Sequence, residues 1–496
     1  MDPPDEFCDP LTFDLMKDPV VTPDGHSYER ETILKCLAEK QESPLTRTPA
    51  TVASLRPNRA LKARIEAWVQ EQTGAPPEEA KEGDGEPMEV DACFPGEGGL
   101  ELTPPAPPFY SQEGNKATLV LPTPGIVSLP PTDLLCVVDI SGSMGSEATM
   151  KNTEGKTESH GLSILDIVKH ALRTLLAGLR PIDRIGLITF DNLIETAFPL
   201  SLVTVTQKAA FKTKLATIYP RGTTNLWGGL AQAIATFGEL ELEGRNAHIL
   251  VFTDGQPNVH PPRGELDTLA RVLKTTRCPP IHTFGFGTYL DSDLLWNLAK
   301  QGGGMYSYIP DSSFVGTIFV NAFASLLSTY LSSLDLYLEG DLKLKLGPVR
   351  LGRTRGIEVE LPRKPVFLQY EFLGKQEIVP IESLPPISAL PASLKARNFP
   401  SLQFRTLMVD TLEGCINLYE IGQKEEALKA LQEAGDFLRS SLPSPLAEAY
   451  LKDLQGQVRL TLEKDEYYTG WGHSYLRSLV RAHELQFCYN FKDPGV

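Results

Sequence analysis

The stretch that decides the fold is Leu134-Leu135-Cys136-Val137-Val138-Asp139-Ile140-Ser141-Gly142-Ser143-Met144-Gly145. An unbroken apolar run such as 134–138 is typical of a strand that is buried on both faces of a sheet. The polar residues that follow would then lie just beyond the end of this strand. Alternate positions of an extended chain point to one side, so Asp139, Ser141 and Ser143 would present a carboxylate and two hydroxyls together.

Outside this stretch, further apolar runs predict buried strands, and helical patterns lie between them. The expected strands are Leu134–Val138, Ile185–Phe190, His248–Thr253 and Ile281–Phe286. Leu165–Leu179 has the spacing of a helix between the first two. This alternation predicts an α/β fold over residues 133–328, a doubly wound parallel sheet with helices on both faces.

Two more polar loops belong to the same predicted sheet. Arg221-Gly222-Thr223-Thr224-Asn225 is one, and Thr253-Asp254-Gly255 directly follows a predicted strand. In doubly wound sheets such loops converge at the carboxyl edge. Oxygen ligands suit a hard cation such as Mg²⁺. Asp and Ser also form turns and cap helices, so an isolated Asp-x-Ser-x-Ser match indicates little, whereas three such loops in order indicate more.

The three loops resemble the metal-ion-dependent adhesion site of von Willebrand factor type A domains. The resemblance implies a Mg²⁺ or Mn²⁺ ion with the ligands Asp139, Ser141, Ser143, Thr224 and Asp254. Thr224 is preferred to Thr223 because it directly precedes Asn225, as in the family pattern. The resemblance also implies a coordination position left open for an acidic residue of a partner. The polar stretch Ser146–Gly161 departs from the family pattern, and either shapes the partner surface or is a solvated insertion.

Residues 1–73 form a separate, loop-rich block. Isolated apolar residues stand between prolines in Phe7-Cys8-Asp9-Pro10-Leu11-Thr12-Phe13-Asp14-Leu15-Met16-Lys17-Asp18-Pro19-Val20, which is followed by Gly25-His26-Ser27-Tyr28-Glu29-Arg30 and Ser43-Pro44-Leu45-Thr46-Arg47. A short helix is expected around Ile33–Leu37. A second, amphipathic helix would begin after Asn58 as N-cap, with Leu61, Ile65 and Trp68 on one face.

This block resembles a U-box along nearly all of its length. The resemblance implies a small α+β fold similar to a RING domain, in which salt bridges and hydrogen bonds replace zinc ions. It also implies that two loops and the helix between them bind a ubiquitin-conjugating enzyme. The residues carried over for this contact are Leu11, Phe13, Cys36, Pro44 and Arg47.

Two of these positions need comment. Arg47 matches the basic residue that contacts both the conjugating enzyme and its ubiquitin, and Cys36 stands where the family often has Trp or His, which should weaken that contact. Outside the resemblance, Leu11 and Phe13 would be taken as core residues and Arg47 as a solvated charge.

Composition limits the classes of partner. The chain has 496 residues, a formal net charge of -16 and no Lys/Arg-rich run, so nucleic acid and anionic membranes are poor candidates. Its seven cysteines are widely spaced without a Cys-x-x-Cys pair, which argues against a zinc finger and fits a reducing compartment. The acidic N-terminus and the absence of an apolar run of membrane-spanning length predict neither a signal peptide nor a membrane span. We therefore expect an intracellular protein of the cytoplasm or nucleus.

The remaining segments differ in composition. Residues 74–112 contain eight Pro and six Gly, and nine acidic residues against one Lys give a formal charge of -8, so a disordered linker is expected. The expected order is 1–73 U-box, 74–112 linker, 113–132 β-strand segment, 133–328 type A domain, 329–385 β-rich segment and 386–496 helical region. Ala117–Leu121 could pair with strands of the β-rich segment. Trp471–Leu476 and Asn490–Pro494 resemble a tail found after type A domains in some intracellular proteins.

Together these features predict a ubiquitin-protein ligase. The U-box would orient ubiquitin on its conjugating enzyme without a covalent intermediate, so no catalytic nucleophile is expected, and the type A domain would bind a protein substrate or adaptor through the metal. The alternative is a non-enzymatic binding or scaffold protein in which the U-box only mediates assembly. A metal-dependent hydrolase is disfavoured because no general base stands out.

Overall fold

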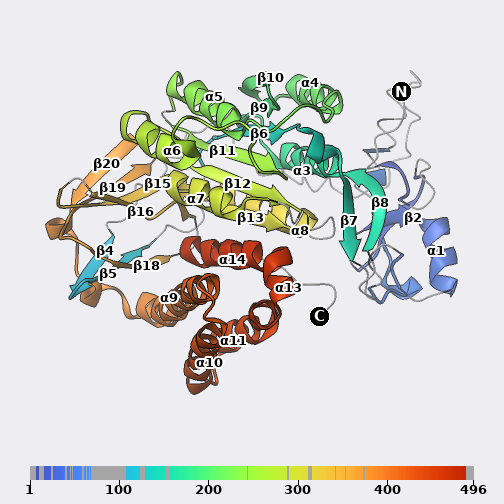
Figure 1. Cartoon of the computed structure of the whole chain (residues 1–496). Coiled ribbons are helices and arrows are strands. Elements are labelled where there is room, and N and C mark those ends of the chain that lie inside the picture. Colours follow the sequence, from blue (N-terminus) through green and yellow to red (C-terminus); the bar gives the residue numbers. More distant parts are fainter. Residues whose placement is uncertain are drawn as a thin grey trace, which may run out of the picture. The chain divides into compact units, whose positions relative to one another are not determined.

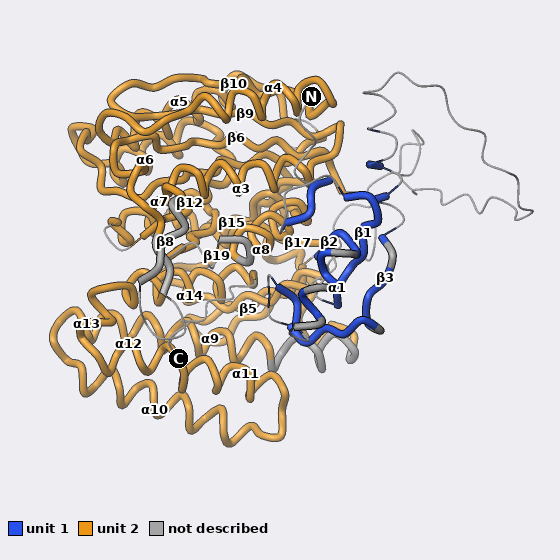
Figure 2. The backbone as a smooth tube through the Cα atoms, turned by 90° about the vertical axis from the view of Figure 1, so that its right-hand side faces the viewer, with its two compact units in different colours: residues 1–97 blue, residues 98–496 orange. Residues whose placement is uncertain are grey.

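The computed structural model divides into two compact units, residues 1–97 and 98–496, which Figure 2 colours separately. The residues it describes are 7–10, 16–23, 26–39, 42–44, 46, 48–58, 61–62, 64–65, 68, 108–122, 129–151, 157–242, 244–287, 290–310, 315–340, 342–351, 354–372 and 375–487. Residues 74–107 of the predicted linker, 74–112, lie outside these residues.

The end of the predicted linker is instead a strand. β4 (Phe109–Glu113) pairs antiparallel with β5 (Lys116–Leu121), with Phe109 opposite Val120. The proline-rich composition ends at Pro108, and the chain beyond it keeps its backbone donors, so it can join a ladder. Because β4 begins at Phe109, the linker boundary predicted at residue 112 is wrong.

The first unit is built on a small antiparallel sheet. Its strand order is β2 (Ser27–Glu29), β1 (Pro19–Val21), β3 (Arg56–Pro57). Between β2 and β3 the chain forms α1 (Arg30–Glu39) and a short 3-10 helix, Val52–Ser54. The helix expected around Ile33–Leu37 is thus confirmed. The core cluster of the first unit consists of Val20, Tyr28, Ile33, Leu37, Ala50 and Leu55.

A second small cluster of this unit confirms the predicted amphipathic helix. Asn58 Oδ1 accepts a hydrogen bond of 3.1 Å from Leu61 N, which is the expected N-cap. Leu61 and Ile65 are buried with Phe7, and Trp68 packs against them. The terminal helix therefore closes over the start of the same unit.

The second unit is organised by a six-stranded sheet (Figure 1). Its order is β10 (Ile194–Leu202), β9 (Arg184–Phe190), β6 (Thr132–Asp139), β11 (Asn246–Thr253), β12 (Ile281–Phe286) and β13 (Tyr306–Ile309). All neighbours are parallel except β10 and β9. The four predicted strands fall within β9, β6, β11 and β12, so the doubly wound sheet is confirmed.

Helices cover both faces of this sheet. One apolar cluster joins a face to α3 (Ile164–Gly178), α4 (Val205–Ala216) and α8 (Val315–Leu327). The other joins the opposite face to α5 (Leu226–Gly238), α6 (Gly264–Thr275) and α7 (Ser292–Gly302). The predicted helix Leu165–Leu179 corresponds to α3 within one residue at each end.

The β-rich segment folds against a strand that precedes the central sheet. Four strands pair in the order β16 (Leu342–Lys345), β15 (Ser333–Leu338), β19 (Pro365–Phe372), β20 (Lys375–Pro380), and a second sheet has the order β18 (Arg355–Glu360), β5, β4. The short β14 (Thr329–Leu331) pairs with β17 (Val349–Arg350). The pairing of β5 with β18 confirms that the central domain is inserted between two parts of one β-structure.

The C-terminal region is helical, as expected. It contains α9 (Ala392–Glu420), α10 (Lys424–Ser440), α11 (Pro445–Asp453), η6 (Leu454–Val458), α12 (Arg459–Glu463), α13 (Asp465–Tyr467), η7 (Tyr468–Gly472) and α14 (His473–Leu485). Leu476 and Leu479 of α14 belong to the same apolar cluster as α5 and α7, so this region extends the core. Among the described helices, none combines the length and apolar character that a membrane crossing requires.

Candidate functional site

The predicted metal ligands come together at the carboxyl edge of the central sheet. β6 ends at Asp139 and its parallel neighbour β11 ends at Thr253, so the loops after them start side by side. Ser143 Oγ donates a hydrogen bond of 2.9 Å to Asp254 Oδ1, and the hydroxyls of Ser141 and Ser143 lie 3.1 Å apart. Two of the three predicted loops are thus in direct contact.

The third loop reaches the same point. Gly142 N donates to Gly222 O at 3.2 Å, which fastens the first loop to the loop that carries Thr224. A Cβ atom built on Gly255 would lie 3.5 Å from Ser143 Oγ and 3.7 Å from Thr224 Oγ1. All five predicted ligands, Asp139, Ser141, Ser143, Thr224 and Asp254, therefore surround one small volume.

Hydrogen bonds from neighbouring residues fix the orientation of the ligands. Asp139 Oδ1 accepts a bond of 2.8 Å from Ser141 N, and Asp139 Oδ2 accepts one of 2.5 Å from Thr253 Oγ1. Thr224 N donates to Asn258 Oδ1 at 3.0 Å. Such supporting contacts hold the oxygens of the candidate ligands in place.

Burial and neighbouring negative charge disfavour the ionised forms of Asp139 and Asp254. Burial raises the pKa of Asp139, and the charge of Asp191 raises it further, although bonds from Thr253 and Ser141 lower it. Burial, followed by the charge of Asp139, raises the pKa of Asp254 to about 6. A site that concentrates buried negative charge in this way favours a cation.

A cavity of about 560 Å³ opens above these residues. Its walls include Ser141, Ser143, Thr224 and Asp254, so the oxygens face a space that a partner side chain can enter. The donors are hydroxyl and carboxylate oxygens without nitrogen or sulfur, a set that fits Mg²⁺ or Mn²⁺ and would not select zinc.

The polar insertion beside this cavity is a β-hairpin. β7 (Glu147–Lys151) pairs antiparallel with β8 (Thr157–Ser163), while residues 152–156 lie outside the described residues. The hairpin is closed at its base by a bond of 3.0 Å from Ile164 N to Ser146 O, and both of these residues line the cavity. The insertion therefore starts and ends at the rim of the metal site.

Sequence reasoning missed Asp191, which also lies at this edge. It directly follows β9, and Asp191 Oδ2 accepts a bond of 2.9 Å from Arg221 Nε. Asp191 O also accepts from Asn225 N at 3.0 Å, so this residue holds the Thr224 loop against the sheet. A carboxylate after an apolar strand was the available signal, because Asp139 and Asp254 follow the same rule.

The residues predicted to contact a conjugating enzyme are only partly described. Leu11, Phe13 and Arg47 lie outside the described residues. Cys36 and Pro44 are half-buried, and Cys36 packs against the core cluster of the first unit. Their grouping into one surface stays a prediction.

Hydrogen bonds and a salt bridge connect the loops of the first unit. Glu29 Oε2 accepts bonds from Lys17 N at 2.6 Å and Asp18 N at 3.0 Å, and Glu29 N donates to Asp9 Oδ2 at 2.8 Å. Arg30 Nε forms a salt bridge of 2.5 Å with Asp18 Oδ2. Carboxylates thus tie the N-terminal loop to β2 and α1.

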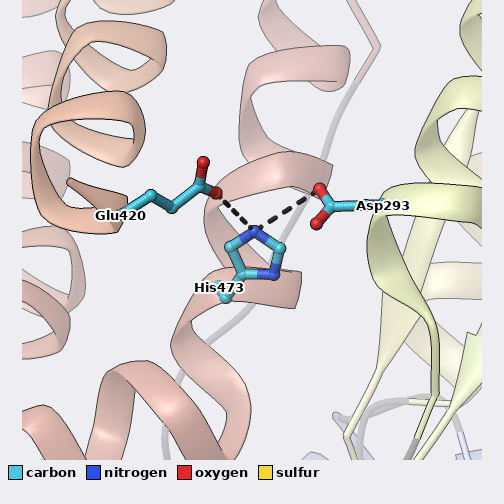
Figure 3. A group of neighbouring side chains, drawn as sticks. All are labelled: Asp293, Glu420 and His473. Atoms are coloured by element: carbon cyan, nitrogen blue, oxygen red, sulfur yellow. Dashed lines mark hydrogen bonds and ion pairs between the residues drawn. The ribbon is translucent and has the colours of Figure 1, made fainter.

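A third polar cluster joins the C-terminal helices to the central domain (Figure 3). His473 Nε2 lies 3.2 Å from Glu420 Oε1 of α9 and 3.5 Å from Asp293 Oδ1 of α7. Arg477 donates to the same two oxygens, at 3.3 and 3.0 Å. Because the Arg477 guanidinium already donates to both carboxylates, we assign this cluster to ion pairing between helices, which gives a role to the tail segment Trp471–Leu476.

Comparison with known proteins identifies both units. Residues 3–74 match the family "U-box domain", residues 134–256 match "von Willebrand factor type A domain", and residues 444–496 match "VWA / Hh protein intein-like". WD repeat, SAM and U-box domain-containing protein 1 of Danio rerio is 47% identical over 70 residues, which are 14% of each chain. Ubiquitin conjugation factor E4 A of Mus musculus is 43% identical over 68 residues, 14% of this chain and 7% of that protein.

The matches to these curated relatives cover 68 to 70 residues, and the chain spans about 15% or less of their lengths. The second unit is similar to a solved structure, "von Willebrand factor type A from Catenulispora acidiphila", with a TM-score of 0.50 and 13% identity over 79% of this chain and 100% of that one. That likeness concerns the fold and includes the segments on either side of the central sheet. The chain therefore joins an N-terminal U-box domain to a von Willebrand factor type A domain that carries a β-rich segment and C-terminal helices.

Proposed function

We propose that this protein is a ubiquitin-protein ligase in which the U-box domain recruits a ubiquitin-conjugating enzyme and the type A domain captures a substrate or adaptor. The observation that carries this proposal is the match of residues 3–74 to the U-box family. A relative that shares this unit is named as a ubiquitin conjugation factor. The hydrogen bonds around Glu29 are consistent with it, because they join the N-terminal loop of this unit to β2.

Transfer would proceed through orientation of the conjugating enzyme, without a covalent ubiquitin on this chain. Restricting the charged enzyme to a reactive geometry lowers the entropic part of the barrier. The contact residues we propose are Leu11, Phe13, Cys36, Pro44 and Arg47. The reducing cytoplasm or nucleus, where ubiquitination takes place, is the compartment we propose for it.

Autoubiquitination with purified activating enzyme, a panel of conjugating enzymes and the full chain tests this function. Leu11→Ala and Arg47→Ala should each abolish chain formation, since loss of one central contact of an interface costs about 1–3 kcal/mol. Both variants should melt like the parent protein. Unchanged chain formation by both variants would refute the assignment, and a complete lack of activity in the parent protein would favour the scaffold alternative.

The second part of the proposal concerns the metal site. Asp139, Ser141, Ser143, Thr224 and Asp254 would hold Mg²⁺ or Mn²⁺, with some ligands acting through water. The bound ion supplies a Lewis-acidic position that an incoming Glu or Asp of the partner can occupy. This chain's own part is to orient the hydroxyls, to exclude water with the cavity walls, and to hold the two carboxylates against their mutual repulsion.

Calorimetric titration of the full chain with Mg²⁺ and Mn²⁺ tests the metal site. We expect saturable binding that Asp139→Ala removes, together with loss of captured protein partners in chelator. The surface variant Asp267→Ala on α6 is the matched control, because its exposed carboxylate lies in the same domain. Absence of binding of either ion at millimolar concentration would rule the site out.

A further inference from the structure

A second cavity, of about 210 Å³, lies where β16, β18, α9 and α14 meet. It shares no lining residue with the cavity at the metal site. Its walls carry the cationic side chains Lys300, Lys345, Arg355, Arg405 and Arg481. The carboxylates in its walls are Glu358, Asp410 and Glu484. The cavity wall therefore has an excess of two positive charges.

The carboxylates do not balance the cations that face them. Glu484 is shared, since its Oε2 accepts from Arg481 Nη1 at 2.6 Å and its Oε1 pairs with Lys300 Nζ at 3.1 Å. Glu358 pairs with Lys116 at 3.2 Å. Burial raises the pKa of Asp410, which weakens it as a counter-charge.

Three of the five cations have no carboxylate within ion-pairing distance among the described residues. These are Lys345, Arg355 and Arg405. Arg355 is 3% exposed and donates only to backbone oxygens, those of Pro348, Leu346 and Glu484. Burying unpaired charge is costly, and an anion from outside the chain would offset this cost.

Two N–H donors at the cavity have no acceptor within the described part of the protein. These are Arg355 Nε and Arg481 Nη2, and both are buried; His483 Nε2 is also buried without a hydrogen-bond partner. Arg481 is itself 4% exposed, and its Nε is held by Gly304 O at 2.8 Å, so its free nitrogen has a fixed position. Buried donors of this kind are normally satisfied in native proteins.

The electrostatic environment points the same way. Burial, and then the neighbouring charges of Arg350, Arg481 and Arg405, lower the pKa of Arg355 well below its usual range. Burial also lowers the pKa of Lys345, to which Arg481 contributes. The protein therefore concentrates like charges in a place where water does not screen them.

We propose that this cavity binds a small phosphate anion, held by Lys345, Arg355, Arg405 and Arg481. The unpaired cations suit a phosphate anion, and guanidinium groups from β18, α9 and α14 line the same cavity, where they can donate to its oxygens. The bound anion would join the β-rich segment to the C-terminal helices. It acts apart from the metal site, and is independent of the U-box.

Titration calorimetry of the desalted full chain tests this assignment, with inorganic phosphate, glycerol 3-phosphate and sulfate as separate ligands. We expect saturable one-to-one binding of phosphate or of its monoester, and the tighter of the two identifies the source. Lys345→Gln should weaken binding about tenfold, because it removes one charged donor without breaking a hydrogen bond or ion pair to another described residue. Lys343→Gln on the same strand is the matched control, since Lys343 pairs with Asp335 at 3.3 Å and does not line the cavity.

A melting experiment separates ligand binding from a purely structural role. Without phosphate, Lys345→Gln should melt at a higher temperature than the parent protein, because the substitution relieves repulsion between the cations of the cavity. With saturating phosphate, the variant should melt at a lower temperature than the parent protein. A lower melting temperature under both conditions would overturn the proposal. So would the lack of saturable binding of either phosphate compound, sulfate affinity equal to that of phosphate, or unchanged affinity in Lys345→Gln.

Discussion

Replacing Asp254 with Asn should stabilise the metal-free protein at neutral pH and abolish its stabilisation by Mg²⁺. Burial and the charge of Asp139 raise the pKa of Asp254 from 3.8 to about 6. Each pKa unit corresponds to about 1.4 kcal/mol, so ionising this side chain in the folded, metal-free protein costs roughly 3 kcal/mol. The amide of Asn carries no charge and can still accept the bond from Ser143 Oγ.

The pH dependence follows from the direction of the shift. Because the folded protein holds this proton more tightly than the unfolded chain, stability contributed by Asp254 is present below pH 3.8 and is lost as the pH rises to about 6. In chelator at pH 7.5 the Asn variant should therefore be more stable by up to about 3 kcal/mol, and the difference should shrink towards pH 4.

Urea unfolding followed by tryptophan fluorescence measures this effect. Three of the four tryptophans, Trp227, Trp296 and Trp471, lie in the second unit, so the signal reports mainly on it. With Mg²⁺ the parent protein should become more stable than the variant. The ion stabilises the parent protein by mass action, whereas the variant lacks one of the proposed ligands. Asp267→Asn, an exposed change on α6, should behave like the parent throughout. An Asp254→Asn protein that is less stable in chelator, or that gains as much from Mg²⁺ as the parent, would refute the reasoning.

Three further predictions concern the supporting residues. Thr253→Val removes the hydrogen bond to the Asp139 carboxylate and should weaken Mg²⁺ binding at least about tenfold in calorimetry. Arg477→Gln removes the guanidinium that joins α7 to α9, and because its partners are half-exposed it should lower the free energy of unfolding by only about 1 kcal/mol in urea. Glu29→Ala leaves two backbone donors without their acceptor and should destabilise the U-box by about 1–3 kcal/mol. On heating, the variant should lose conjugating-enzyme binding at a lower temperature than the parent protein. An unchanged temperature for this loss would show that the network is dispensable.

The sequence was sufficient to predict the central sheet and the polar loops that meet at its carboxyl edge. Apolar runs such as Leu134–Val138 are buried on both faces, so they identify strands without knowledge of the pairing. The polar residues after them converge because parallel strands end at one edge. Strand β10 was missed, since this antiparallel edge strand is half-exposed and interrupted by Pro199, and its pattern resembles a loop.

The cavity lined by Lys345, Arg355, Arg405 and Arg481 and the ion-pair cluster at His473 could not be predicted in this way. Their residues come from segments that lie far apart in the chain, as Asp293, Glu420 and His473 do. No local spacing relates such positions, because packing of the C-terminal helices on the central domain brings them together. The contact residues of the U-box came from the family resemblance, since Leu11 or Arg47 alone has the character of an ordinary core or surface residue.

The central claim is that ubiquitin transfer by the U-box and metal-dependent capture by the type A domain are separate activities of one chain. The most direct test is the discharge of ubiquitin from a pre-charged conjugating enzyme onto free lysine, measured with the full chain in excess EDTA and in Mg²⁺. This step needs no activating enzyme, so chelation does not interfere with it. We predict equal acceleration under both conditions and its loss in Arg47→Ala. Absence of acceleration with every conjugating enzyme tried, or acceleration in Mg²⁺ alone, would contradict the account.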